Sequence, residues 1–234
     1  MELVEGVVFD MDDTLYLERD YALSGFRAVA RFLASPDESA VDVLYRHMAE
    51  TFESGNRRTV FNQVLLEWPH LQATASVKEL VQIYRNHDPA IHLLPGIADL
   101  LTELKAQGIP VGLISDGFLP SQESKFRALG IRELVDPAIF TDAWGSEFWK
   151  PHPRAFMSTA QTWGIPDSRL AYIGDNPAKD FVAPSALGWR TVRLRIPGQI
   201  HEDEEARTET TAAECECTSV RSLTELLRKW TSIM

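Results

Sequence analysis

Two aspartates one residue apart, Asp10 and Asp12, directly follow a short apolar run near the start of the chain. Residues two apart in an extended segment project to the same side, so we expect these carboxylates to lie near one another. Close carboxylates repel each other unless a cation joins them. Carboxylates in such a pair can serve as nucleophile, as acid and base, or as ligands for a hard metal ion such as Mg²⁺.

Three further polar groups occur later in the chain. The segment Ser115-Asp116-Gly117 offers a hydroxyl, a carboxylate and a glycine whose backbone N–H can approach an anion closely. Lys150 stands among prolines before a predicted helix, and a third group begins at Gly174-Asp175 and extends to Asp180. Ligands of open parallel sheets bind beyond the carboxyl ends of the strands, so we expect these groups to converge on one site.

Short apolar runs alternate with helix-length segments and predict the sheet that would position these residues. The alternation favours parallel strands, so the predicted fold class is α/β, with a Rossmann-like parallel sheet core flanked by helices. The polar groups follow the ends of these strands or precede a helix. The predicted strands are residues 4–9, 110–115, 138–141, 170–174 and 189–194.

Residues 16–92 differ from the rest because they show four successive helical patterns and no convincing strand pattern. Turn-forming pairs such as Ser35-Pro36 and Trp68-Pro69 separate the patterns. We therefore predict an all-helical domain inserted into the α/β domain. The predicted division assigns residues 1–15 and 93–234 to the α/β domain and residues 16–92 to the helical domain.

Taken in order, Asp10-Met11-Asp12-Asp13-Thr14, Ser115, Lys150 and Gly174-Asp175 with Asp180 resemble the four motifs of the haloacid dehalogenase (HAD) superfamily. Each motif alone is short, but four in order, each at a strand end or just before a helix, are specific. The resemblance covers nearly the whole chain. It implies a hydrolase of the phosphatase branch, in which the inserted helical domain is a C1-type cap that closes over the site and selects the substrate.

The resemblance also implies roles for individual residues. Asp10 and Asp175 would bind Mg²⁺ through their side chains and Asp12 through its backbone carbonyl. Asp10 would attack phosphorus to form an aspartyl-phosphate, and Asp12 would be the general acid and base. Ser115 and Lys150 would hold the phosphoryl oxygens and complete the catalytic set. The residues expected to contact substrate are Thr14, Ser115, Asp116, Gly117, Lys150, Arg57 and Arg58.

The acidic residues predict a metal ion on physical grounds as well. Two like charges about 4 Å apart cost roughly 4 kcal/mol at an effective dielectric constant of 20. A site that holds Asp10, Asp12 and Asp175 therefore repels a phosphate dianion. A hard divalent cation with oxygen ligands offsets this repulsion, and Mg²⁺ readily shares its coordination shell with phosphate and water.

Asp12 also distinguishes among the reactions of the superfamily. An acid two residues after the nucleophile is expected of phosphatases and mutases, whereas dehalogenases and ion-pumping ATPases have a non-acidic residue there. The alternatives are a phosphomutase of the same family and a non-catalytic HAD-like binding protein. The second alternative would be expected to have lost Asp10, Asp12 or Lys150, and all three are present.

Substrate identity depends on residues outside the four motifs. Arg57 and Arg58, after Gly55-Asn56, could reach a second anionic or hydroxyl-rich part of the substrate, or could simply be solvated. We expect a small sugar or polyol phosphate. For several polar residues of the motifs the alternative is a local structural role such as capping a turn, and for Asp180 and Asn176 a contact with the metal shell or the substrate stays open. These polar residues are Asp13, Asp116, Asn176, Lys179 and Asp180.

Composition excludes several other classes of function. The formal net charge is −11 and no stripe of basic residues interleaved with aromatics occurs, so nucleic acid is not an expected partner. No apolar stretch reaches about 18 residues and the N-terminal sequence does not resemble a signal peptide, so we expect no membrane association and a cytoplasmic location. Cys215 and Cys217 are expected to be an exposed pair without a role. The sequence leaves the oligomeric state open.

Overall fold

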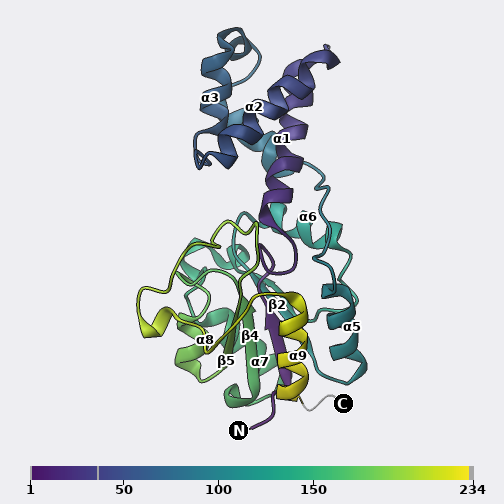
Figure 1. Cartoon of the computed structure of the whole chain (residues 1–234), viewed down its shortest axis with the longest axis vertical. Coiled ribbons are helices and arrows are strands. Elements are labelled where there is room, and N and C mark those ends of the chain that lie inside the picture. Colours follow the sequence, from purple (N-terminus) through teal and green to yellow (C-terminus); the bar gives the residue numbers. More distant parts are fainter. Residues whose placement is uncertain (1, 36, 232–234) are drawn as a thin grey trace. The chain divides into compact units, whose positions relative to one another are not determined.

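The computed structural model describes residues 2–35 and 37–231 of the 234-residue chain (Figure 1). The chain forms two compact units. The core unit comprises Met1–Arg19 and His92–Met234, and the helical unit comprises Asp20–Ile91. The sequence placed the first boundary after Leu15, whereas the core unit continues to Arg19.

The core unit contains one six-stranded sheet in which every pair of neighbouring strands is parallel, as predicted. The strand order is β3-β2-β1-β4-β5-β6, so the chain leaves β1 to one side and later returns to the other. The carboxyl ends of β1 and its two neighbours therefore meet where the topology reverses, which is the expected ligand position. The strands are β1 Gly6–Phe9, β2 Val111–Ser115, β3 Ala138–Phe140, β4 Leu170–Gly174, β5 Arg190–Leu194 and β6 Cys215–Cys217.

The sixth strand was not predicted, and the expectation of two exposed cysteines is wrong for one of them. Cys217 is 5% exposed, while Cys215 is partly buried; both thiols are free. The strand is three residues long and lies in an acidic segment, so its pairing with β5 creates β structure that no apolar pattern indicates. Burial raises the pKa of both thiols, which makes them poor nucleophiles.

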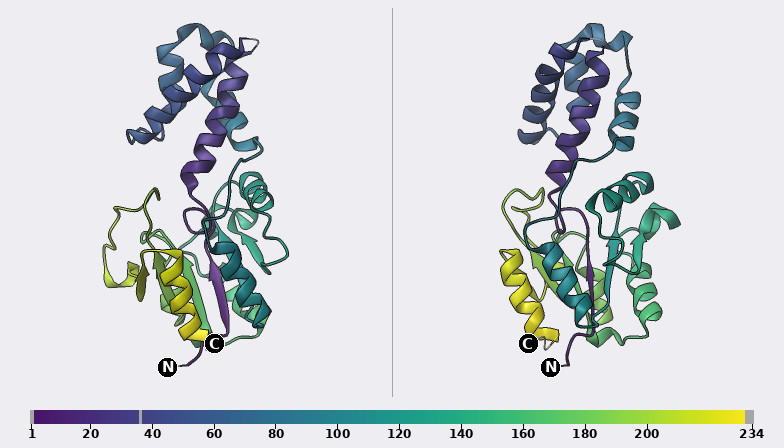
Figure 2. Two further views of the ribbon diagram at one scale, coloured as in Figure 1. Left: turned by 45° about the vertical axis from the view of Figure 1, so that its right-hand side comes forward. Right: turned by 90° about the vertical axis from the view of Figure 1, so that its right-hand side faces the viewer.

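Helices cover both faces of the sheet and exclude water from it. On one face α5 and α9 lie side by side (Figure 2), and the Arg228 guanidinium of α9 is 2.6 Å from the Glu103 carboxylate of α5. On the other face α7 and α8 pack on Val8, Ile114 and Tyr172. The helices of the core unit are α5 Ile97–Ala106, α6 Leu119–Leu129, α7 Arg154–Trp163, α8 Val182–Leu187 and α9 Val220–Thr231.

Among its described residues the helical unit contains four α-helices, which match the four helical patterns of the sequence, and two short 3₁₀ segments. A cluster of aromatic rings forms its interior, because the Phe26 ring lies 5.7 Å from Phe52, 6.1 Å from Phe61 and 5.7 Å from Tyr84, centroid to centroid. The fourth helix begins with a capping box in which Ser76 and Glu79 bond to each other's backbone N–H. The helices are α1 Glu18–Ala34, which begins in the core unit, α2 Val41–Glu53, α3 Val60–Glu67 and α4 Val77–Asn86.

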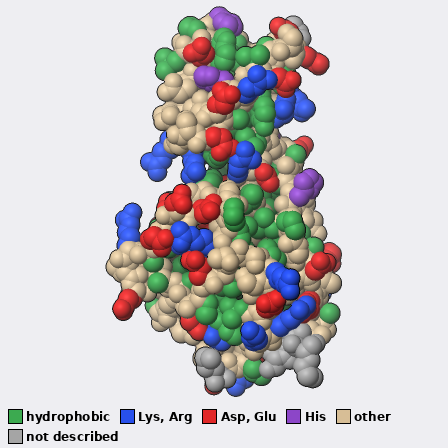
Figure 3. Space-filling model, in the orientation of Figure 1, with side chains coloured by type: hydrophobic (Ala, Val, Ile, Leu, Met, Phe, Trp, Pro, Cys, Tyr) green, Lys and Arg blue, Asp and Glu red, His purple; other side chains and the backbone are tan. Residues whose placement is uncertain are grey.

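Two surface properties bear on the expected partners. No helix within residues 2–35 and 37–231 is long and apolar enough to cross a membrane. On the face drawn in Figure 3, Lys and Arg side chains lie among Asp and Glu side chains and form no continuous basic area. The absence of a nucleic-acid partner remains a prediction.

Candidate active site

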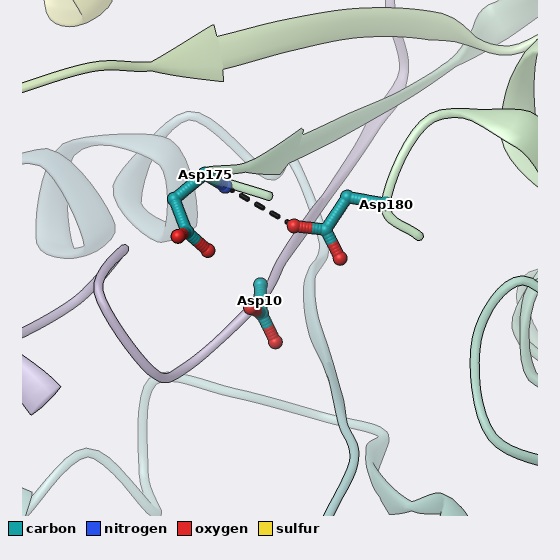
Figure 4. A group of neighbouring side chains, drawn as sticks. All are labelled: Asp10, Asp175 and Asp180. Atoms are coloured by element: carbon teal, nitrogen blue, oxygen red, sulfur yellow. Dashed lines mark hydrogen bonds between the residues drawn. The ribbon is translucent and has the colours of Figure 1, made fainter. Parts of the chain in front are cut away.

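The carboxyl ends of β1 and β4 bring three buried carboxylates together. Asp10 follows β1, Asp175 follows β4, and Asp180 lies in the loop after β4. Each side chain offers an oxygen within 4.8 Å of the others, and Figure 4 shows the three side chains as neighbours. The Asp10 backbone N–H donates to the Ile173 carbonyl at 2.8 Å and joins the two strand ends. The strands thus fix where these carboxylates converge.

The loop after β4 folds back so that Asp180 enters this cluster. Its carboxylate accepts hydrogen bonds from the backbone N–H groups of Asp175 at 3.2 Å and Asn176 at 2.9 Å. Gly174 permits this approach, because a Cβ atom at that position would come within 2.5 Å of Asp180 Oδ2. The sequence left the role of Asp180 open, and the structure places it beside Asp10 and Asp175.

Lys150 supplies a positive charge to the carboxylate cluster. Its buried Nζ lies 2.7 Å from Asp10 Oδ1, 2.8 Å from Asp180 Oδ1 and 2.9 Å from the Tyr172 hydroxyl. Burial disfavours the ammonium, but the Asp10 and Asp180 carboxylates outweigh burial and raise the pKa of Lys150 well above its ordinary value. Lys150 is therefore a permanent cation beside Asp10.

Lys150 contacts two of the three buried carboxylates and Lys179 adds a second positive charge nearby, so the carboxylates still outnumber the ammonium groups. Burial raises the pKa of Asp10 to about 7, although Lys150 acts to lower it. Burial also raises the pKa of Asp175 well above its ordinary value, and the Asp180 and Asp10 carboxylates add to this effect. For Asp180 burial is outweighed by Lys150 and Lys179, and its pKa falls. The site therefore favours an additional cation.

The donor atoms suit a hard divalent cation. Asp175 Oδ2 is buried and has no hydrogen-bond partner among the described residues, so one ligand oxygen is already free. Carboxylate oxygens from Asp10 and Asp175 are ligands that Mg²⁺ prefers in proteins. The residues present thus fit the ion that the sequence predicted, with Asp180 as an additional member of the cluster.

The Asp12 carboxylate is bound by a separate set of hydrogen-bond donors and is not part of this cluster of three carboxylates. Its Oδ1 accepts from Lys125 Nζ at 2.8 Å and from the Tyr16 hydroxyl, and its Oδ2 accepts from Gln122 Nε2 at 2.9 Å. Burial alone would raise the pKa of Asp12, but the Lys125 ammonium and these hydrogen bonds lower it. Asp10 and Asp12 therefore occupy different electrostatic surroundings.

Sequence reasoning missed the residues that contact these two aspartates. Tyr172 lies inside the apolar run of β4 and resembles an ordinary core residue. Gln122 and Lys125 could have been recognised more easily as residues with a buried polar partner, because they share the buried face of α6 with Phe126 and Leu129. Polar side chains on the apolar face of an amphipathic helix need buried partners.

Two buried hydroxyls in the predicted site have unused hydrogen-bonding capacity. Ser115 ends β2, the neighbour of β1, and Thr14 lies in the loop after β1. Neither Ser115 Oγ nor Thr14 Oγ1 has a hydrogen-bond partner within the part of the chain that the structure describes. Such groups are costly to bury unless a ligand or water satisfies them.

Asp116, which was predicted to contact substrate together with Gly117, makes several side-chain contacts within the protein. Asp116 Oδ1 accepts from Thr141 Oγ1 at 2.7 Å and from the Lys150 backbone N–H at 3.1 Å, and its Oδ2 lies 3.6 Å from Lys179 Nζ. Gly117 has a φ of +117°, which favours glycine. Asp116 therefore supports the backbone that carries Lys150.

Asp13 supports the loop that carries Asp10 and Asp12. It is buried, has a φ of +53°, and accepts from the backbone N–H groups of Glu18 at 2.7 Å and Ile200 at 2.6 Å. Burial raises the pKa of Asp13 to about 7. These contacts agree with the turn-capping role expected from the sequence.

Arg57 and Arg58 lie in the helical unit, around a cavity of about 210 Å³ that Arg85 also lines. Aromatic side chains form part of the wall, and the Arg57 guanidinium carbon lies 5.3 Å from the centroid of the Phe52 ring. The cavity thus combines cationic and aromatic groups.

The pKa values of Asp10 and Asp13 predict that the metal-free protein loses stability as pH rises from about 5 to about 8. Both pKa values are about 7 in the folded protein, against an ordinary value of 3.8. The folded form keeps protons that the unfolded form has released. The resulting stability is fully present below about pH 4 and is lost as pH rises through 7.

Thermal unfolding in the presence of a chelator measures this effect. Added Mg²⁺ is expected to raise the melting temperature more at about pH 8 than at about pH 5, because deprotonated carboxylates bind the ion better. Sodium chloride of equal ionic strength is the control. A chelated protein that becomes more stable between these two pH values contradicts the prediction.

Comparison with known proteins gives consistent matches. Residues 4–188 match the family model of the haloacid dehalogenase-like hydrolases. A glyceraldehyde 3-phosphate phosphatase of Methanopyrus kandleri is 27% identical, over 97% of this chain and 98% of its own length. A phosphoglycolate phosphatase of Shigella dysenteriae is also 27% identical, over 82% of each chain.

Solved structures show the same fold with more than one chemistry. A HAD family hydrolase from Deinococcus radiodurans, solved with bound phosphate and sodium, has a TM-score of 0.67 and 21% identity, covering 98% of this chain and 97% of its own. A 2-haloacid dehalogenase from Pseudomonas syringae has a TM-score of 0.63 and 18% identity, covering 97% and 100%. The fold alone therefore does not identify the reaction.

Proposed function

This chain belongs to the haloacid dehalogenase-like hydrolases and is a phosphatase of that family, and we propose that it hydrolyses small sugar or polyol phosphates through an aspartyl-phosphate on Asp10. One observation carries the proposal. A buried carboxylate, Asp10, lies 2.7 Å from a buried ammonium, Lys150, while a second acid, Asp12, has separate donors two residues further along the chain. Nucleophile, charge stabilisation and acid-base group are then three different side chains.

We propose that Asp10 and Asp175 hold Mg²⁺ through their side chains and Asp12 through its backbone carbonyl. When bound, the ion supplies positive charge that offsets the repulsion between these carboxylates and the substrate phosphate. The buried Oδ2 of Asp175 and the shortage of positive charge in the cluster support this proposal. Asp180 keeps Lys150 and the loop after β4 in place.

In the first step an Asp10 carboxylate oxygen attacks phosphorus. The bond from phosphorus to the ester oxygen breaks, and the leaving oxygen takes a proton from Asp12. Lys150 orients Asp10 and neutralises part of the charge on the transferring phosphoryl group. The unused Ser115 hydroxyl is a suitable donor to a phosphoryl oxygen.

In the second step water attacks the phosphorus of the aspartyl-phosphate and gives a proton to Asp12. The bond between phosphorus and Asp10 breaks, so inorganic phosphate leaves and the free carboxylate is restored. The lowered pKa of Asp12 favours its ionised form, which is the form this step requires. Asp12 thus loses a proton in the first step and regains one in the second.

We propose that Arg57 and Arg58 bind an anionic or hydroxyl-rich part of the substrate. Replacing both by alanine is expected to raise KM for an anionic substrate about tenfold with a small change in kcat, because lost uniform binding appears in KM. Steady-state kinetics on glycolate phosphate and glycerol phosphate measure this. Arg46→Ala, an exposed arginine of α2 outside the cavity, is the control. Equal KM values for wild type and double variant would refute the contact.

A panel of phosphorylated metabolites, assayed for inorganic phosphate with and without Mg²⁺, tests the proposed function. We expect Mg²⁺-dependent turnover, highest with small sugar or polyol phosphates. Transfer of the phosphoryl group to another position of the substrate without release of phosphate would instead identify a mutase. No turnover of any phosphate ester would refute the proposal.

A further inference from the structure

We propose that Lys125 is a positioning residue that, together with Gln122, fixes the Asp12 carboxylate for proton transfer to the leaving oxygen. This inference rests on the proposed function and adds a helix, α6, to the parts of the fold that the reaction requires. The four HAD-like motifs contain neither residue. Both are instead found by following the hydrogen bonds of Asp12.

The contacts hold both oxygens of the Asp12 carboxylate. Oδ1 is bound by Lys125 Nζ at 2.8 Å and by the Tyr16 hydroxyl, while Oδ2 is bound by Gln122 Nε2 at 2.9 Å. Rotation of the carboxylate about its Cβ–Cγ bond would stretch these bonds on both oxygens at once. The carboxylate therefore has one preferred orientation.

The exposed fractions of the Lys125 and Asp12 side chains show which of the two a substrate can reach. The Lys125 side chain is 5% exposed, whereas the Asp12 side chain is 17% exposed. Asp12 thus keeps an open side on which an ester oxygen or a water can lie, while Lys125 holds it from the buried side. A residue in this place acts on the substrate only through Asp12.

The location of Lys125 is costly for a residue with only a structural role. It lies on the face of α6 that also buries Phe126 and Leu129. Replacement of a whole buried ion pair by apolar side chains of similar size is often neutral or stabilising, whereas removal of one partner leaves the other charge buried and uncompensated. The bond to Asp12 gives this buried ammonium a role that an apolar side chain cannot fill.

The side-chain amide of Gln122 is held in place by a second hydrogen bond. Its Nε2 donates to the Asp116 carbonyl as well as to Asp12, so the amide joins the loop after β2 to the loop after β1. Gly117 makes room for this amide, because a Cβ atom there would lie 2.6 Å from Gln122 Nε2. The position of Asp12 is thus tied to the loop that follows Ser115.

The leaving group of the substrate separates a positioning role from a structural one. An alkyl ester such as glycerol phosphate leaves as a strongly basic alkoxide and needs a proton, whereas p-nitrophenolate leaves without one. Lys125→Met keeps length and removes the charge. We expect kcat/KM to fall about 100-fold for glycerol phosphate and less than about tenfold for p-nitrophenyl phosphate, since general acid catalysis contributes at least about 100-fold.

The variants Lys125→Arg and Lys105→Met are the matched controls. Arginine restores a donor cation and is expected to recover most of the loss with glycerol phosphate, while Lys105 is an exposed lysine of α5. Should Lys125→Met fail to fold, Gln122→Leu removes the Oδ2 donor and is expected to give the same selective loss. Folding is checked by the melting temperature.

Three results would overturn the inference. One is an equal fall of kcat/KM for both esters in Lys125→Met, and another is no fall for either ester. The third is a Lys125→Arg variant as impaired as Lys125→Met. A wild-type enzyme that hydrolyses neither ester would refute the proposed function itself, and this outcome is visible before any variant is compared.

Discussion

Replacing Asp10 by asparagine is expected to abolish phosphate release, with kcat reduced at least about 10⁴-fold, the order of loss seen when a covalent nucleophile is removed. The neutral amide keeps the shape of the side chain but cannot attack phosphorus. Lys150 still finds Asp180 and the Tyr172 hydroxyl, so the surroundings of the site are retained. Phosphate release and the mass of the protein after incubation with substrate measure the loss.

The stability of this variant provides an independent readout. Burial raises the pKa of Asp10 to about 7, so the charged form is disfavoured in the metal-free protein above that pH. Asp10→Asn is therefore expected to melt at or above the temperature of the metal-free wild type at about pH 8. Asp99→Asn, at an exposed position of α5, is the control. Substantial turnover by a folded Asp10→Asn enzyme would exclude the aspartyl-phosphate mechanism.

The residues that sequence could predict are those at the strand ends. Asp10, Lys150 and Asp175 follow or precede regular elements whose apolar patterns are strong, and parallel strands deliver their carboxyl ends to one edge. Five of the six strands were predicted for the same reason. In the helical unit, the aromatic residues recur at helical spacing and form the observed interior.

The residues that sequence could not predict act through contacts between distant segments. Tyr172 and Lys150 are 22 positions apart, and Lys125 and Asp12 are 113 apart. Spacing carries no information on such pairs when one partner looks like a core residue. β6 was missed because strand pairing with β5, rather than its own acidic sequence, determines its conformation.

The different surroundings of Asp10 and Asp12 explain how two similar side chains can perform different chemistry. Burial dominates at Asp10 and raises its pKa, whereas Lys125 and hydrogen-bond donors dominate at Asp12 and lower its pKa. In the metal-free protein the raised pKa belongs to the proposed nucleophile, and a cation bound beside Asp10 would lower it toward the ionised form that attack requires. Lys150, close to Asp10, and Lys125, close to Asp12, are the two cations that maintain this division.

The second large effect is expected for Asp12→Asn, which should accumulate phosphoenzyme on an activated ester. The amide oxygen can still accept hydrogen bonds from Lys125 and Tyr16, and only the bond from Gln122 is lost. The amide neither donates a proton to the leaving group nor accepts one from water. p-Nitrophenolate leaves without a proton, so the first step proceeds. Hydrolysis of the aspartyl-phosphate is expected to slow by about 10²–10⁴-fold, the usual contribution of a general base.

Rapid mixing with p-nitrophenyl phosphate should therefore give a burst of nitrophenolate of about one equivalent per site, followed by slow turnover. Mass spectrometry of the quenched protein should place the phosphoryl group on Asp10. The double variant Asp10→Asn/Asp12→Asn, which lacks the nucleophile, should show neither burst nor added mass. A phosphoryl group on any other residue would show that Asp10 is not the nucleophile. A variant that turns over as fast as wild type would show that Asp12 is not the base of the second step.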